Sequence, residues 1–127
     1  FLGTVHGADP SGKPSLSEME CLYSTGDELP FPPQSVVQVR IATGRPHQIR
    51  IHMAWLGHPL VADPLFAAGG RPSPDTRAVP GDLGYRLHAW KLSFTHPSSG
   101  ERVRLFAPPP AERWSEFRKI LPQLWEP

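Results

Sequence analysis

Cysteine is nearly absent from this sequence, which has one residue of this type, Cys21, among 127. A single cysteine excludes an internal disulfide and any four-cysteine zinc site. The sequence also lacks an apolar run approaching the roughly 18 residues that a membrane-spanning helix requires. Because no signal peptide is visible either, we expect an intracellular protein, cytoplasmic if its source is bacterial.

Two common catalytic signatures are missing as well. No G-x-S-x-G stretch is present, so the nucleophile elbow of a hydrolase is not indicated. Gly69 and Gly70 lack the lysine and the spacing of a phosphate-binding loop. The formal net charge of +1 gives no overall indication of a nucleic-acid partner, but the distribution of charge is informative. Arg40, Arg45 and Arg50 fall within eleven residues that contain no acid.

What the sequence does contain predicts an α+β fold in one domain, residues 1–127, with a mixed, mainly antiparallel sheet and flanking helices. Short apolar or alternating stretches predict strands at 1–7, 16–23, 35–43, 90–94 and 103–107, and "HPSSGE" at 96–101 predicts a hairpin turn between the last two. We expect strand 35–43 to lie inside the sheet. Residues 67–86, rich in glycine and proline, are expected to form a loop excursion.

Two helices are predicted, at 46–57 and 111–121. Thr43 or Gly44 can cap the first, and Gly57 ends it. Its apolar stripe is expected to be Ile49, Met53 and Leu56, separate from a polar face that carries Arg50. In the second helix Trp114, Phe117 and Leu121 share a face, and Pro122 stops the helix. One core is expected to bury Val37, Val39, Ile41, Ile49, Met53, Leu92 and Phe94 together.

The stretch "TGRPHQIRIHMAWLGHPLVADPLF", residues 43–66, carries an unusual density of polar groups. Its histidines, His47, His52 and His58, are spaced by five and six residues, whereas two metal ligands on one helix face require a spacing of three or four. A metal site is therefore disfavoured. Basic residues near the start of a helix suit contacts with nucleic-acid phosphates. Solvated or ion-paired arginines would give the same pattern, so the residues by themselves leave both readings open.

The segment "GRPHQIRIHMAWLGHPLVAD" resembles motif III of the RluA-type pseudouridine synthases, which runs approximately G-R-T-H-Q-I-R-x-H-x-x-x-x-G-H-P-L-x-G-D. The departures are Pro46, where threonine or serine is usual, and Ala62, where glycine is usual. "RLHAWKLSFTHPSSGERVRLFAPPP" (86–110) resembles the Leu-His-Ala strand and hairpin of this family, and "FLGTVHG" (1–7) resembles the end of its motif II. The resemblance spans most of the chain and preserves the order of the motifs.

This resemblance implies an RNA-modifying isomerase that converts uridine into pseudouridine by detaching the base, turning it over and rejoining it through carbon. It implies that Arg50 pairs with the catalytic carboxylate, that Leu87 packs against the flipped base and that Phe1 stands where a tyrosine usually stacks on the base. Contacts with RNA are implied for Arg45, His47 and Gln48. Asp63 is expected to stabilise a turn. No metal or cofactor is implied, and the partner is a uridine in ribosomal, transfer or messenger RNA, with no membrane involved.

The family's nucleophilic aspartate lies in an H-R-L-D motif, which this sequence does not contain. We therefore expect the chain to represent the C-terminal portion of a catalytic domain, from the end of motif II onward, and to lack activity without an N-terminal segment that supplies the aspartate. The alternative is a non-catalytic RNA-binding module derived from the same family. In either case Arg50 is expected to point into a concave, partly exposed surface and to lack a carboxylate partner from within this chain.

Overall fold

The computed structural model describes residues 7–26, 32–66, 69–70 and 84–127. The chain divides into two compact units, Phe1–Arg86 and Leu87–Pro127. Both are small and mix strands with helices, so the α+β class is confirmed. Residues 1–6 of the strand expected at 1–7 lie outside the described residues, and this part includes the site residue Phe1. Most of the predicted 67–86 excursion lies outside them as well.

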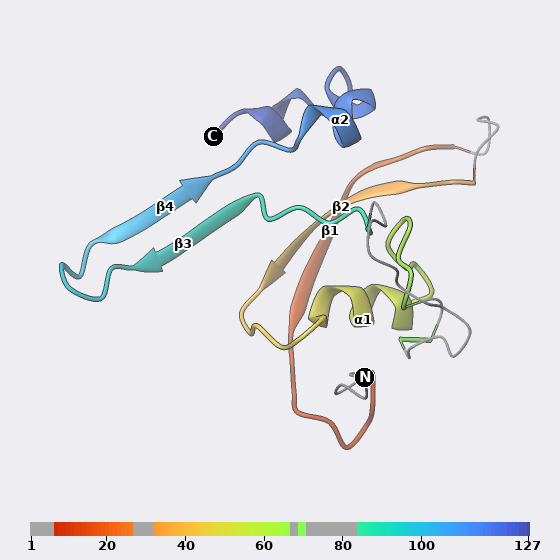
Figure 1. Ribbon diagram of the computed structural model, residues 1–127, viewed down its shortest axis with the longest axis horizontal. Helices are drawn as coiled ribbons and strands as arrows, with labels where there is room; N and C mark the ends of the chain where they lie inside the picture. The colour runs from red at the N-terminus through yellow and green to blue at the C-terminus, as the bar shows by residue number, and fades with distance from the viewer. Residues whose placement is uncertain (1–6, 27–31, 67–68, 71–83) are drawn as a thin grey trace. The chain divides into compact units, whose positions relative to one another are not determined.

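The first unit contains an antiparallel strand pair, β1 (Ser17–Ser24) and β2 (Ser35–Ile41), followed by helix α1 (Gln48–Trp55) (Figure 1). The register shifts by a β-bulge between Cys21 and Tyr23. A bulge places two residues of one strand against one of the other, which explains why the alternation of β1 is broken in the sequence. The strand expected at 16–23 is confirmed.

Helix α1 packs its buried face into a small core made of Ile51, Ala54 and Phe66. Its C-terminus has the hydrogen bonds of a Schellman motif: the Gly57 N–H donates to the Ala54 carbonyl at 3.0 Å and the His58 N–H donates to the Met53 carbonyl at 2.9 Å. Gly57 has a φ of 86°, the left-handed conformation that this motif requires. The predicted helix end at Gly57 is therefore confirmed.

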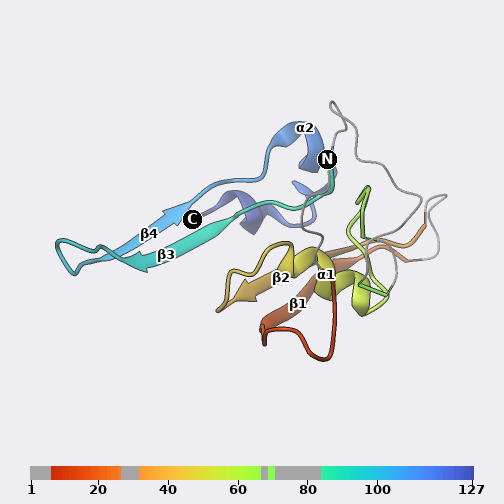
Figure 2. The same cartoon turned by 60° about the horizontal axis from the view of Figure 1, so that its bottom comes forward.

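The second unit is a β-hairpin followed by short helical turns (Figure 2). Strands β3 (Lys91–Thr95) and β4 (Arg102–Phe106) pair antiparallel, and the turn between them is closed by the His96 N–H, which donates to the Glu101 carbonyl at 2.8 Å. The hairpin predicted around 96–101 is confirmed. Helix α2 (Ala111–Trp114) continues into the 3-10 turn η1 (Ser115–Phe117), and a second 3-10 turn, η2 (Pro122–Trp125), follows.

Several predictions about the fold are wrong. Within the described residues each sheet has only two strands, so β2 is not an inner strand. The expected final helix 111–121 is broken into short helical turns. Pro122, which was expected to stop that helix, is the first residue of η2. None of the seven residues expected to share one core is fully buried, and Ile41, Leu92 and Phe94 are exposed. Among the residues that the structure describes, no helix has the length and apolar character needed to cross a bilayer.

Candidate active site

Arg50 lies at the centre of the candidate site and is almost completely buried, with 6% of its surface exposed. Its Nε and Nη2 atoms donate to the two carboxylate oxygens of Asp63 at 2.8 and 2.7 Å. The guanidinium lies over the rings of Tyr85 and Phe66, with Cζ at 4.0 and 4.9 Å from their centroids. Its Nη1 lies 3.2 Å from Nδ1 of His47. Because arginine only donates hydrogen bonds, this contact requires an unprotonated Nδ1 on His47.

This arrangement corrects two expectations about Arg50. Its side chain was expected to be partly exposed and to lack a carboxylate from within the chain, but it is buried in a bidentate ion pair with Asp63. The physical reason is the cost of burying a charge, since an unpaired guanidinium in the protein interior is disfavoured by several kcal/mol. Asp63 removes this cost, because its side chain is only 1% exposed and faces Arg50 directly.

Asp63 is held in place by a tight turn that follows α1. Its Oδ1 accepts hydrogen bonds from the backbone N–H groups of Leu65 and Phe66 at 2.9 and 3.0 Å, in addition to the bond from Arg50. The expected turn-stabilising role of Asp63 is confirmed. Ala62, just before it, has a φ of 61°, a left-handed conformation that favours glycine. This conformation gives a reason why the family motif usually has glycine at this position.

The pKa values of the two partners shift in opposite directions. Burial by itself raises the pKa of Asp63, but the hydrogen bonds from Arg50, Phe66 and Leu65 and the positive charge of Arg50 outweigh it, so the carboxyl pKa lies below its ordinary value. The hydrogen bond to Asp63 raises the pKa of Arg50, although burial opposes this shift. Both groups are therefore charged near neutral pH, and the pair presents a fixed dipole.

Gln48 joins the start of β1 to the start of α1. Its Oε1 accepts from the Thr43 hydroxyl at 2.8 Å and from the Arg45 N–H at 3.2 Å, while its Nε2 donates to the Leu16 carbonyl at 2.8 Å and the Ser17 hydroxyl at 3.0 Å. The amide has two donors and two main acceptor positions, and all are occupied. The prediction that Thr43 or Gly44 caps the helix is wrong, because His47 holds the N-cap position of α1 and the Thr43 hydroxyl donates to Gln48 instead. The predicted RNA contact of Gln48 stays a prediction.

The remaining predicted residues lie closer to the surface. Arg45 is exposed, and its guanidinium forms no hydrogen bond or ion pair with a residue in the described part of the chain. His47 is exposed and precedes α1 in a left-handed conformation, with a φ of 56°. Leu87, at the start of the second unit, is 43% exposed. Their roles at a target base or in RNA contacts stay predictions.

His52 belongs to the same helix, but its ring contacts the start of β1 and the residues just before it. Its Nδ1 lies 2.8 Å from the Ser17 hydroxyl and its Nε2 lies 3.1 Å from the Ser15 hydroxyl.

Within the described residues, no group of three His, Cys, Asp or Glu side chains is arranged to hold a metal ion. A shallow pocket lined by Leu16, Glu18, Arg40, Ile41 and Ala42 includes none of the predicted site residues.

Sequence reasoning missed the aromatic walls of the site. The rings of Tyr85 and Phe66 contact the guanidinium, yet neither residue lies within the segment that resembles motif III. Tyr85 follows the glycine- and proline-rich stretch, and nothing in its neighbours indicates a partner 35 residues upstream. Phe66 follows Asp63 within the same turn, and a large aromatic residue soon after a motif aspartate is the one signal that could have suggested it.

Comparisons with known proteins identify relatives of this chain. No protein-family model and no solved structure matches it. Curated relatives do match: RNA pseudouridine synthase 5 of Oryza sativa is 39% identical over 84% of the chain and 31% of the relative. An uncharacterized RNA pseudouridine synthase of Synechocystis is 41% identical over 87% of the chain and 36% of the relative.

Ribosomal large subunit pseudouridine synthase D of Neisseria meningitidis is 42% identical over 78% of the chain and 26% of the relative. The chain spans about a third of the length of the curated relatives it matches. The match therefore covers most of this chain but a minor part of each relative. Over the length that it spans, the chain belongs to the RluA-type family of RNA pseudouridine synthases.

Proposed function

We propose that this chain is a portion of the catalytic domain of an RNA pseudouridine synthase and that Arg50 is the cation of its active site. The observation that carries the proposal is the binding mode of Arg50. Asp63 occupies the edge of the guanidinium formed by Nε and Nη2. A guanidinium has five N–H donors in a rigid planar fork. Asp63 takes two of them and His47 takes one on Nη1, so at most one donor on Nη1 and one on Nη2 remain for a second oxyanion.

In the proposed site Asp63 positions Arg50, and the catalytic carboxylate approaches the remaining donors. The Arg50 guanidinium contacts two aromatic rings and is bound along one edge by Asp63, so little conformational freedom is lost when the carboxylate binds. An adjacent positive charge keeps that carboxylate ionised, as attack on the nucleoside requires. The carboxylate itself is not among the motifs of this sequence and has to come from an H-R-L-D segment.

RNA is the proposed substrate, with Arg45 and His47 as contacts near the start of α1. The exposed guanidinium of Arg45 is available for a phosphate. Leu87 and Phe1 keep the roles that the resemblance implies, apolar contact with the turned-out base and stacking on it. For Gln48 we propose a supporting role, because its four hydrogen bonds fix the start of the helix that carries Arg50.

The test uses a protein that carries this chain together with an H-R-L-D segment. Arg50→Lys retains the charge that Asp63 needs but loses the planar fork, so we expect pseudouridine formation to fall by about 100-fold while the fold is kept. Arg50→Ala is unsuitable, since it leaves a buried carboxylate unpaired at a cost of about 3–5 kcal/mol. Nucleoside analysis of the treated RNA measures turnover, and Arg118→Lys on the exposed surface is the matched control. Undiminished turnover by the Arg50→Lys variant would show that Arg50 is not the cation of the active site.

A further inference from the structure

The hairpin of β3 and β4 has two chemically different faces. In an antiparallel pair, directly opposite residues share a face. Leu92 pairs with Leu105 and Phe94 pairs with Val103, which makes one face apolar. The other face, which we call the basic face, carries Lys91, Ser93, Thr95, Arg102, Arg104 and Phe106.

The cations of the basic face are exposed and have no acidic partner among the residues that the structure describes. Lys91, Arg102 and Arg104 form no ion pair with any carboxylate in the described part of the chain. Arg102 is held across the hairpin by a hydrogen bond to the Ser93 hydroxyl at 2.7 Å, which leaves its charge uncompensated. The basic face is the side of the hairpin on which positive charge is concentrated.

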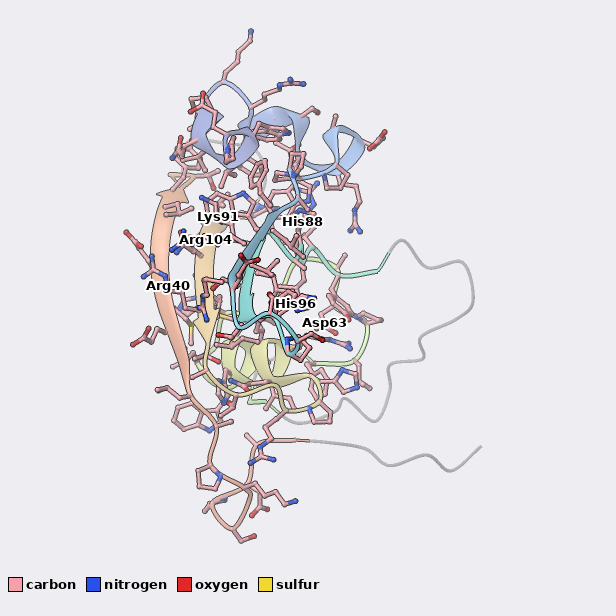
Figure 3. The ribbon with its side chains drawn as sticks, turned by 90° about the vertical axis from the view of Figure 1, so that its left-hand side faces the viewer. Arg40, Asp63, His88, Lys91, His96 and Arg104 are labelled. Carbon is pink, nitrogen blue, oxygen red and sulfur yellow. The ribbon has the colours of Figure 1, made fainter. Side chains whose placement is uncertain are left out.

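Charge is unevenly divided within the second unit. Residues 88–107 contain three arginine or lysine residues and one acid, Glu101, whereas residues 108–127 contain three of each. Figure 3 shows Lys91 and Arg104 next to each other on the hairpin, in agreement with the pairing register, which makes them diagonal neighbours. The positive charges therefore follow the two strands as a short row instead of being scattered over the unit.

We propose that the basic face binds the sugar-phosphate backbone of RNA as a second contact surface, made of residues other than those around α1. A row of cations with interleaved hydroxyls complements a linear polyanion whose negative charges are regularly spaced. The face has one partly buried aromatic residue, Phe106, and no broad apolar surface, which disfavours a lipid bilayer as the occupant. The proposal rests on the proposed function, since RNA is the partner expected of a pseudouridine synthase.

Such contacts position a substrate without reading its sequence. Lys91 acts as a point charge, and the hairpin backbone keeps the cations at fixed spacings along the strands. The hairpin would therefore increase affinity for RNA equally for many sequences. Any selection of the target uridine would come from elsewhere in the protein.

The experiment measures binding of the complete 127-residue chain to a fluorescein-labelled, uridine-containing single-stranded RNA by fluorescence anisotropy between about 50 and 200 mM salt. The test variant is Lys91→Gln/Arg104→Gln, because neither side chain forms a hydrogen bond within the described residues. The matched control is Arg118→Gln/Lys119→Gln, which removes two exposed cations from the same unit. Circular dichroism of each variant verifies that the fold is retained.

We expect the slope of log affinity against log salt to become shallower by about 1.4 in the test variant, because each lost phosphate contact on a single strand contributes about 0.7. Affinity at low salt should fall at least tenfold, and the control should change by less than twofold. Arg102→Gln supplies a third, independent measurement with an expected loss of about 0.7 in slope.

The outcomes separate the two proposals. If the wild-type chain binds RNA but the test variant and the control have the same slope, the basic face is not an RNA surface and the proposed function stands. If the wild-type chain shows no salt-dependent binding to RNA, the basic face and the RNA contacts proposed around α1 are both overturned. Equal losses in the test variant and the control would show that only total charge matters and would also overturn the inference.

Discussion

Ala62 shows how a single departure from a family pattern affects the backbone. It has a φ of 61°, a conformation that costs an alanine about 1–2 kcal/mol. Ala62→Gly removes this strain, although the added freedom of the unfolded chain offsets part of the gain. We expect a net stabilisation of about 0.5–1 kcal/mol, measured as a higher urea midpoint at unchanged m-value. Ala42→Gly, at an exposed position without positive φ, should instead lower stability, and equal effects of the two substitutions would contradict the assignment.

The Asp63 carboxylate makes the stability of the first unit sensitive to acid. Its pKa is lowered in the folded state, so its contribution is fully present above about pH 4, the value for an unfolded aspartate, and is lost as the pH falls through the lower folded pKa. We expect the difference in unfolding free energy between the wild type and Asp63→Asn to be largest near neutral pH. Urea titrations down to about pH 3 should show this difference shrinking. A difference that stays constant over that range would mean that Asp63 is not the titrating group.

Which residues form the site, and which of them pair with one another, could be predicted from the sequence only in part. The motif indicates that Arg50 and Asp63 are important, and it predicts that Asp63 stabilises a turn. It does not predict that the two residues form an ion pair with each other, because the resemblance assigns each of them a separate role. From the sequence by itself, charged and amide side chains are expected to be exposed to solvent. Arg50 and Gln48 are instead buried, since a counter-ion and a complete set of hydrogen bonds compensate for their loss of water.

Among the secondary-structure elements, the strands and the hairpin were predictable and the buried face of α1 was not. Alternation of apolar and polar residues located β2, β3 and β4 within one or two residues. In α1 the expected apolar stripe ends in Leu56, which is 49% exposed, whereas the buried face contains Arg50 and Ala54. A periodicity argument assigns an arginine to the solvent side, so the ion pair with Asp63 shifted the true core face away from the predicted one.

The packing between α1 and the returning chain depends on Gly70. A Cβ atom added there would lie 2.7 Å from Cβ of Trp55 and 2.9 Å from the Ile51 carbonyl oxygen, and its φ is 67°. Gly69 has a similarly positive φ of 94°, but a Cβ would meet nothing within 4 Å. We expect Gly69→Ala to cost about 1–2 kcal/mol from backbone strain and Gly70→Ala to cost about 1–3 kcal/mol more from overpacking. Chemical denaturation of both variants measures the difference, and equal losses would show that the close approach is relieved without cost.

At the scale of the whole molecule, the sequence indicates the family but not the arrangement of the chain. Motif III is long and its order of residues is specific, so kinship with RNA pseudouridine synthases can be inferred from the residues by themselves. The number of strands along the chain suggests a single sheet. The described residues instead form two two-stranded sheets, and a strand's partners are set by contacts that local patterns do not encode.

The last prediction concerns catalysis by these 127 residues. The chain has five aspartates and no H-R-L-D motif. Of the two that the structure describes, Asp63 is bound to Arg50 and to backbone N–H groups, and Asp9 accepts a hydrogen bond from the Ser11 N–H at 2.8 Å. A carboxylate engaged in this way is a weak nucleophile, and releasing Asp63 would leave Arg50 buried without its counter-ion.

We therefore expect no pseudouridine when the pure chain is incubated with uridine-containing RNA and the nucleosides are analysed. A complete pseudouridine synthase acting on the same RNA is the positive control. The same chain combined with an H-R-L-D segment in one polypeptide should restore formation, because in the proposed site Arg50 would then meet the catalytic carboxylate as well as Asp63. Robust pseudouridine from the chain by itself would contradict this view, and substitution of each aspartate by asparagine would then identify the residue that acts in its place.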